Sequence, residues 1–114
     1  MSIGSQIRRA KTVKSPRILD ELSRNEEWKV RFHVAGNLNT PVDILDRLSR
    51  DESEYTRMAV AGNLNTPVEI LDRLSGDEEH VVRWSLSHNP KWRAMEESGL
   101  LDIAVSVSKW LNIL

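Results

Sequence analysis

The sequence predicts an all-α protein, an α-solenoid of about four two-helix repeats of about 26 residues. The first reason is an internal repeat: residues 34–49, VAGNLNTPVDILDRLS, return as residues 60–75, VAGNLNTPVEILDRLS, with a single substitution. The second reason is that the 26-residue step continues beyond this block in both directions. It relates Ile18, Ile44 and Ile70; Leu22, Leu48 and Leu74; Arg31, Arg57 and Arg83; and Asn37, Asn63 and Asn89.

Composition narrows the class of protein. The 114 residues are 39% hydrophobic and 29% charged, a balance typical of a single globular domain. The absence of cysteine excludes disulfides, a thiolate nucleophile and cysteine-held zinc or iron–sulfur clusters. The sequence starts without the apolar core of a signal peptide and contains no run of about 20 apolar residues. We therefore expect a cytoplasmic protein that does not span a membrane.

Charge divides the chain into two parts. Residues 1–19 carry five basic and no acidic side chains, whereas the remaining residues carry 11 basic and 17 acidic ones. We expect residues 1–14 to be a basic, partly disordered N-terminal leader and residues 15–114 to form a single repeat domain. The expected units are residues 15–36, 37–62 and 63–88, followed by a capping unit at residues 89–114.

The first helix of each unit is indicated by a capping residue followed by proline. Thr40 is a suitable N-cap, Pro41 fits the first helical position, and Asp43 completes a capping box. Thr66, Pro67 and Glu69 repeat this pattern, while Ser15 with Pro16 and Asn89 with Pro90 keep the cap and the proline.

The second helix of each unit follows a candidate cap at Asn25, Asp51 or Asp77 and ends near Gly36 or Gly62. At about 100° per residue, Val30 and Val34 share one arc with Arg31 and Ala35 beside it, so this arc is the expected core side. The side chains on the opposite arc change from unit to unit. They are Lys29 and His33, then Tyr55 and Ala59, then Val81 and Ser85, with Phe32, Met58 and Trp84 at the boundary.

Residues 30–51, VRFHVAGNLNTPVDILDRLSRD, and 56–77, TRMAVAGNLNTPVEILDRLSGD, resemble the leucine-rich repeat variant family, whose units look like VRxxVAxNPxTPxxxLxxLAxD. The resemblance extends over most of residues 15–90. It implies a right-handed superhelix of paired short helices, some of them 3₁₀, similar to HEAT and armadillo solenoids. Two departures from the family pattern are Leu38 and Leu64 in place of its first proline, and Ser23, Ser49 and Ser75 in place of its alanine. Some family members bind an iron–sulfur cluster through a cysteine-rich module, whose ligands this sequence lacks.

Three arginines recur six residues after the candidate caps of the second helices. We interpret them, with two of the caps, as a structural ladder of charged hydrogen bonds between units. The alternative is a row of arginines along a phosphate backbone, which together with the basic leader would make the chain a nucleic-acid-binding HEAT-like solenoid. The acidic balance of the remaining chain favours the ladder. Its residues are Arg31, Arg57, Arg83, Asp51 and Asp77.

No group of residues points to catalysis. The three histidines are too few and too scattered for a metal site, and nothing resembles a nucleophile with an adjacent base. A glycine-rich phosphate loop is also missing from the sequence. We therefore predict no enzyme activity, no cofactor and no metal.

The sequence instead favours a non-catalytic repeat scaffold that binds a protein or peptide partner through the varied face of the second helices. The competing interpretation of the aromatic stripe on this face is ordinary core packing. The predicted partner-binding residues are Lys29, Phe32, His33, Tyr55, Met58, Val81, Trp84 and Ser85.

Residues 100–114 are predominantly apolar, with Leu100, Ala104, Val107, Leu111 and Leu114 at helical spacing. The segment is too short to span a bilayer. We expect it to cover the open end of the last repeat, and a homodimer through this segment is the alternative.

Overall fold

The computed structural model describes residues 1–99, 107 and 111, and among these residues every regular element is an α-helix. The 3₁₀ helices implied by the family resemblance are not present in this part of the chain, and none of its helices has the length and apolar character that crossing a bilayer requires. The helices are α1 (Ile3–Thr12), α2 (Pro16–Leu22), α3 (Trp28–Gly36), α4 (Val42–Leu48), α5 (Glu54–Gly62), α6 (Val68–Leu74), α7 (His80–Ser87) and α8 (Pro90–Ser98). This arrangement confirms the predicted all-α repeat fold.

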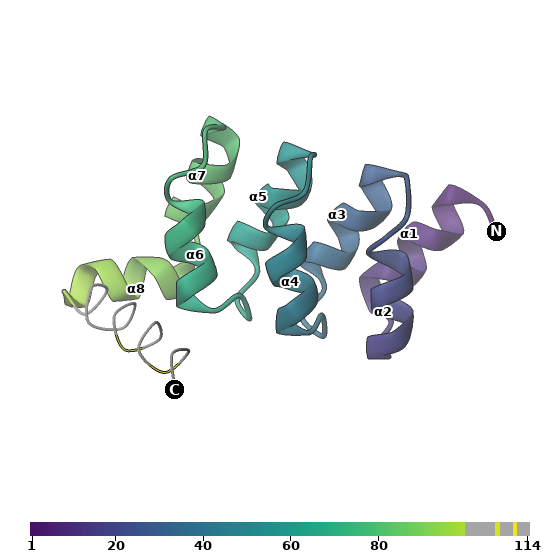
Figure 1. The fold of residues 1–114 in the computed structure, drawn as a ribbon, viewed down its shortest axis with the longest axis horizontal. Helices are drawn as coiled ribbons and strands as arrows, with labels where there is room; N and C mark the ends of the chain where they lie inside the picture. The colour runs from purple at the N-terminus through teal and green to yellow at the C-terminus, as the bar shows by residue number, and fades with distance from the viewer. Residues whose placement is uncertain (100–106, 108–110, 112–114) are drawn as a thin grey trace.

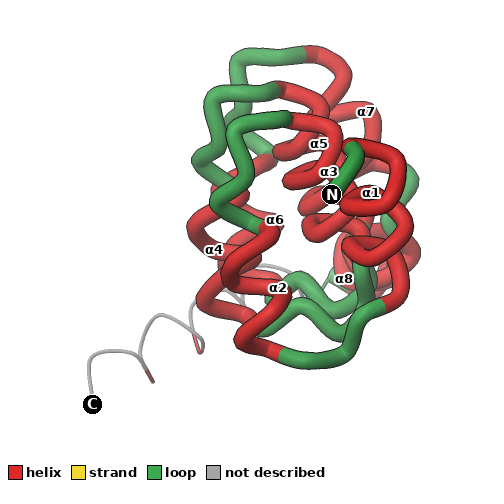
Figure 2. Tube along the Cα trace, turned by 90° about the vertical axis from the view of Figure 1, so that its right-hand side faces the viewer, coloured by secondary structure: helices red, strands yellow, loops and turns green. Residues whose placement is uncertain are grey.

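The helices form two layers (Figure 1). Helices α1, α3, α5 and α7 lie side by side in one layer, and α2, α4 and α6 form the other. Seen along the stack, the helices and loops of successive units lie one behind another and follow a similar course (Figure 2). The contacts between successive units come mainly from the first layer, where α1 contacts α3, α3 contacts α5, and α5 contacts α7.

The core lies between the two layers and repeats with the 26-residue step. Val30, Val34 and Ala35 of α3 are fully buried, as the predicted core arc requires, and α3 contacts α4 of the next unit, whose Leu45 and Leu48 are also buried. Burying one such side chain contributes about 1.5–3 kcal/mol. The equivalent residues one unit later, Val60, Ala61, Leu71 and Leu74, are buried in the same way.

Residues 1–14, expected to be a basic, partly disordered leader, contain the helix α1. Ser2 caps this helix by accepting a hydrogen bond from the backbone N–H of Ser5, and Ala10 is fully buried against α3. Ile7, Ala10 and Val13 recur at intervals of three residues and give α1 one apolar side. Helix α1 therefore takes the first place in the layer that α3, α5 and α7 continue, and its basic residues lie on its exposed side.

The predicted capping by Thr40 and Thr66 is wrong. Helix α4 begins after Pro41 without a side-chain cap, and the Thr40 hydroxyl instead donates to the carbonyl of Val34 at 2.6 Å. Thr66 donates to the carbonyl of Val60 in the same way at 2.8 Å. The carbonyl groups in the last turn of a helix lack intrahelical partners. The threonine hydroxyl therefore bonds to the end of the preceding helix and does not cap the start of the following one. Ser15 and Asn89 do cap α2 and α8, as predicted.

A buried asparagine joins each unit to the preceding one. The Asn63 side-chain amide donates to the carbonyls of Ala35 and Asn37, at 2.8 and 3.1 Å, and its oxygen accepts from the backbone N–H of Asn65. These bonds satisfy carbonyl groups at the end of α3 that water cannot reach. The same pattern recurs at Asn37, which donates to Ala10 and Val13, and at Asn89, which donates to Ala61 and Asn63.

The serines that replace the family's alanine also bond to the backbone. Each donates its hydroxyl to a carbonyl three residues earlier, in the last turn of the outer-layer helix. These bonds explain why a hydroxyl is tolerated at Ser23 and Ser49, which are buried, whereas Ser75 is exposed. The donors are Ser23, Ser49 and Ser75, and the acceptors are the carbonyls of Asp20, Asp46 and Asp72.

Thr56 interrupts a column of buried valines. The equivalent positions in the neighbouring units are Val30 and Val82, and all three residues are fully buried. The hydroxyl oxygen of Thr56 has no hydrogen-bond partner among the described residues. A buried hydroxyl without a partner loses its hydrogen bonds to water and gains none inside the protein, so its burial is unfavourable.

Thr56→Val should therefore stabilise the protein by about 1 kcal/mol, because it removes an unsatisfied hydroxyl without changing the volume of the side chain. The measurement is urea unfolding followed by circular dichroism. Thr66→Val is the matched control: it makes the same chemical change but leaves the Val60 carbonyl without its donor, so it should destabilise by about 1–2 kcal/mol. Equal effects at the two positions would contradict this account.

Candidate partner-binding groove

Arginines bridge consecutive units through charged hydrogen bonds. Arg31 binds Asp51 of the next unit through Nε to Oδ2 at 2.8 Å and Nη2 to Oδ1 at 3.1 Å, and its Nη1 donates to the carbonyl of Asn25 at 2.7 Å. Arg57 makes the same contacts with Asp77 and with the carbonyl of Asp51. The side chains of Arg31 and Arg57 are only 9% and 13% exposed. Their guanidinium groups are used inside the protein and do not form a free row for phosphates.

The ladder changes the acidity of its carboxylate. Burial by itself would raise the pKa of Asp77, but hydrogen bonds from Arg57 and from the Glu79 backbone N–H, with the charges of Arg57 and Arg83, lower it below its ordinary value. The hydrogen bond to Asp77 in turn raises the pKa of Arg57. A lowered carboxyl pKa means that this stabilisation is fully present above the ordinary pKa and is lost as the pH falls through the lowered one.

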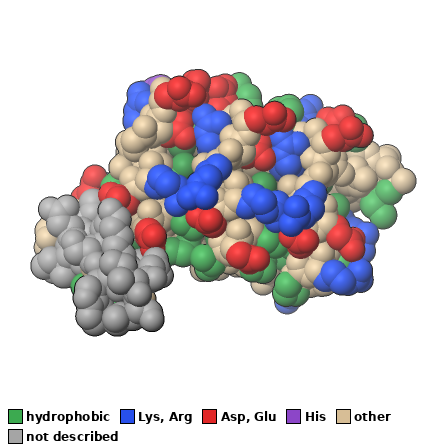
Figure 3. All heavy atoms as spheres, viewed as in Figure 1, with side chains coloured by type: hydrophobic (Ala, Val, Ile, Leu, Met, Phe, Trp, Pro, Cys, Tyr) green, Lys and Arg blue, Asp and Glu red, His purple; other side chains and the backbone are tan. Residues whose placement is uncertain are grey.

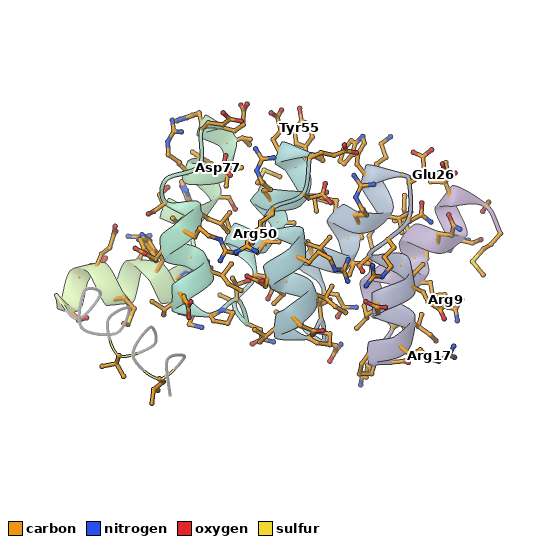
Figure 4. The ribbon with its side chains drawn as sticks, in the orientation of Figure 1. Arg9, Arg17, Glu26, Arg50, Tyr55 and Asp77 are labelled. Atoms are coloured by element: carbon orange, nitrogen blue, oxygen red, sulfur yellow. The ribbon has the colours of Figure 1, made fainter. Side chains whose placement is uncertain are left out.

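The ladder positions at either end differ from the repeat. Arg83 donates to the carbonyl of Asp77 but has no carboxylate partner among the described residues. In the sequence, Ile103 stands 26 residues after Asp77, and Asn25 stands 26 residues before Asp51. Ser5 stands 26 residues before Arg31, so no ladder arginine precedes position 25 to pair with a carboxylate there. An asparagine at position 25 avoids leaving such a carboxylate without a charged partner. Figure 4 shows Asp77, Tyr55 and Glu26 along the edge where α7, α5 and α3 begin.

An apolar groove of about 330 Å³ crosses α3, α5 and α7 on the exposed side of the first layer. Phe32, Met58 and Trp84 line it at the 26-residue step, and Leu38 and Leu64 line it just beyond the ends of α3 and α5. Trp84 is 52% exposed, Leu38 55% and Leu64 48%. The remaining lining residues are Gly36, Ala59, Gly62, Asn63 and Ser85. We call this set of residues the groove.

Small residues keep the groove open. A Cβ atom on Gly62 would lie 3.0 Å from the Ser85 hydroxyl, which itself donates to the carbonyl of Met58 at 2.9 Å. A Cβ atom on Gly36 would meet nothing within 4 Å. A Cβ atom at position 36 therefore fits without displacing a neighbour, and a larger side chain there would occupy part of the groove that Gly36 lines.

The structure brings together some of the predicted partner-binding residues and separates the others. Phe32, Met58, Trp84 and Ser85 line the groove, and His33 lines a smaller cavity beside it. Lys29, Tyr55 and Val81 line neither cavity.

Lys29 and Tyr55 belong to an aromatic cluster at the starts of α3 and α5. The rings of Trp28 and Tyr55 lie 5.0 Å apart between centroids, and the Lys29 ammonium lies 5.9 Å from the Trp28 ring. Val81 is half-buried and packs against the core. The helical wheel grouped these side chains with the groove because it treats a whole helix face as one surface.

Sequence reasoning missed Leu38 and Leu64 as groove residues. They follow the ends of α3 and α5, so a helical wheel does not include them. A signal was nevertheless present, because both stand where the family pattern has proline. Exposed apolar side chains indicate a binding surface where they lie together in one patch, as Leu38 and Leu64 do with Trp84.

The smaller cavity extends the groove toward α1. It is lined by Lys11, Phe32, His33, Gly36, Asn37 and Ala59, and it shares Phe32, Gly36 and Ala59 with the groove. Burial lowers the pKa of His33 below its ordinary value, and the charge of Lys11 lowers it further. We call Lys11 and His33 the basic corner.

The opposite face, formed by α2, α4 and α6, has alternating charges (Figure 3). Arg47 donates to Asp20 of the preceding unit at 2.9 Å, and Arg73 donates to Asp46 at 2.8 Å. Because these opposite charges neutralise one another, this face offers no large field of one sign to a partner. The groove is the more specific feature.

Two stacked layers with inter-unit bonds at a 26-residue step define a helical repeat protein. Residues 28–53 match the family model described as Leucine rich repeat variant, which confirms the resemblance seen in the sequence. The matched segment contains α3, α4 and the Arg31–Asp51 pair. No curated protein and no solved structure matches the chain.

Two expectations from the sequence concern residues that lie mostly outside the described part of the chain. They are the capping role of residues 100–114 and the alternative homodimer through them. Val107 and Leu111 are described, and both are helical and exposed.

Arg57→Gln should destabilise the protein by about 3 kcal/mol, because it leaves Asp77 buried without its charged partner. The measurement is urea unfolding at neutral pH. Arg83→Gln is the control at the equivalent repeat position and should cost less than about 1 kcal/mol, because Arg83 is exposed and forms no salt bridge with a described carboxylate, although its charge acts on Asp77 at a distance. Adding Asp77→Asn to Arg57→Gln should recover part of the loss, since no uncompensated charge remains. Additive losses would contradict the ladder.

Lys11→Gln should raise the pKa of His33 toward its ordinary value, because the variant removes a nearby positive charge while burial remains. An NMR titration of the His33 imidazole protons measures this pKa. Lys14→Gln removes the same charge from a neighbouring exposed position and should leave the pKa unchanged. Equal shifts in both variants would show that His33 responds to net charge and not to Lys11.

Proposed function

We propose that this chain is a non-catalytic repeat scaffold that binds a protein or peptide partner through the groove across α3, α5 and α7. The observation that carries the proposal is the exposure of Leu38, Leu64 and Trp84 around one apolar depression. Exposing apolar surface to water is unfavourable, and contiguous patches of it mark interaction sites. A rigid aromatic side chain such as Trp84 is a common energetic centre of an interface.

The division between frame and groove supports the same proposal. The residues that hold the units together, such as Arg31 and Arg57 or Asn63 and Asn89, are identical from unit to unit. The groove residues Phe32, Met58 and Trp84 stand at one repeat position but differ in kind. A scaffold that repeats its frame and varies its exposed positions can acquire a particular partner without changing its fold.

The hydroxyl groups support the non-catalytic part of the proposal. A nucleophilic hydroxyl needs a neighbouring base to take its proton. The hydroxyls of Thr40, Thr66 and Ser49 instead donate to backbone carbonyls. Within the described residues, no three metal-binding side chains are placed to hold an ion.

The nucleic-acid alternative has weaker support. Its arginine row would need free guanidinium groups, and those of Arg31 and Arg57 donate to carboxylates. Its basic leader contains α1, which packs on α3 and is part of the stack. The exposed basic residues of α1 remain available for charge interactions, and the inference below uses one of them.

Gly36→Leu should abolish partner binding, because Gly36 lines the groove and a bulky side chain there would occupy it; the fold should stay intact, because a Cβ atom at this position meets nothing within 4 Å. The probe is a phage-displayed library of random 12-residue peptides, selected against the wild-type chain and re-tested against the variant by biolayer interferometry. Circular dichroism and urea unfolding establish that the variant is folded.

Gly76→Leu is the matched control. Gly76 lies between α6 and α7, outside the groove, and its nearest contact for a Cβ atom is an ordinary 3.7 Å. This variant should bind the selected peptides as the wild type does. If no peptide is selected, or if the peptides bind Gly36→Leu and the wild type equally, the groove is not the binding site.

A further inference from the structure

The groove and the cavity of the basic corner form a continuous path across the first layer. They share Phe32, Gly36 and Ala59, so a partner lying in the groove over α5 and α3 reaches Lys11 of α1. The far end of the path, at Trp84 and Ser85 of α7, is lined by uncharged side chains. The path therefore has a direction: one apolar end and one basic end.

The basic corner has hydrogen-bond donors without acceptors. Among the described residues, no carboxylate pairs with Lys11, and the His33 ring makes no hydrogen bond, only an edge contact with Phe32 at 4.9 Å between centroids. Asn37, which also lines this cavity, already uses both its amide and its oxygen within the frame. The free polar atoms at this end are therefore those of Lys11 and His33.

Several arginines in the described part of the chain differ from Lys11, because their guanidinium groups pair with carboxylates. The arginines in or just after α4 and α6 reach carboxylates of their own or of the preceding unit, and Arg31 and Arg57 of the ladder reach carboxylates of the next unit. Neither the groove nor its neighbouring cavity is lined by an Asp or Glu side chain of a described residue. The partner must supply the negative charge if the basic corner is to be neutralised.

We propose that the groove binds a short peptide segment of another protein in which an Asp or Glu side chain contacts the basic corner and apolar side chains lie over Met58, Leu64 and Trp84. This inference rests on the proposed function and adds the chemistry and direction of the partner. Apolar contacts in the groove supply affinity, and the acidic residue sets direction, because charge complementarity chiefly determines specificity. The exposed basic residues of α1 add a positive field that attracts an acidic segment to this end.

The same random 12-residue library tests the proposal. Peptides selected on the wild type should be enriched in Asp or Glu on one side of a pair of apolar residues. A synthetic peptide of the selected sequence should bind Lys11→Glu at least about tenfold more weakly than the wild type, because reversing one charge in a contacting pair costs more than 1 kcal/mol.

Lys14→Glu is the matched control. Lys14 is exposed, lies three residues from Lys11 and lines neither cavity, so reversing its charge makes the same change in net charge. It should weaken binding less than about twofold, through the long-range field alone. Replacing the acidic residue of the peptide by lysine should restore binding to Lys11→Glu and weaken binding to the wild type.

Two results separate failure of this inference from failure of the proposed function. Selected peptides that Gly36→Leu blocks, but that show no acidic preference or bind Lys11→Glu and Lys14→Glu equally, would overturn the inference and leave the groove as the binding site. A selection without any peptide that Gly36→Leu blocks would overturn both.

Discussion

A buried asparagine amide holds each unit to the one before it, and the rest of the structure depends on this bond. A short helix ends with carbonyl groups that have no partner, and stacking a second helix against that end removes the water that could serve them. The side-chain amides of Asn63 and Asn89 donate to carbonyl groups at the ends of α3 and α5. These bonds replace the hydrogen bonds to water that the carbonyl groups lose when the units stack. The apolar core can then extend from unit to unit along the chain.

The arginine ladder acts at the opposite ends of the same helices. Arg31 and Arg57 each join a carbonyl just before their own helix to a carboxylate of the next unit, so the two types of bond hold both ends of these first-layer helices. With both ends held, the exposed side of this layer contributes little to stacking. Residues such as Met58 and Trp84 can therefore vary in kind without loss of the fold, which is the condition for a binding surface on a repeat scaffold.

Half of the predicted partner-binding residues line the groove, and the reason the others do not is geometric. Phe32, Met58 and Trp84 follow from helical periodicity, because they occupy one repeat position on parallel helices. Tyr55 shares that face, but it lies at the start of α5, where it contacts Trp28. Leu38 was not predicted because it lies in the turn after α3, and no periodicity describes a turn.

The sequence by itself determined the repeat length, the two helices of each unit, the core positions and the family of the repeat, because these depend on periodicity and on local backbone preferences. Tertiary structure decided which donor serves which acceptor. The sequence suggested that Thr40 caps the helix that follows it, but its hydroxyl bonds to a carbonyl of α3, the helix that precedes it. The sequence also suggested that residues 1–14 are a solvated leader, but they contain α1, the first helix of the stack. Such choices depend on which groups lose water on packing, and only the assembled units decide that.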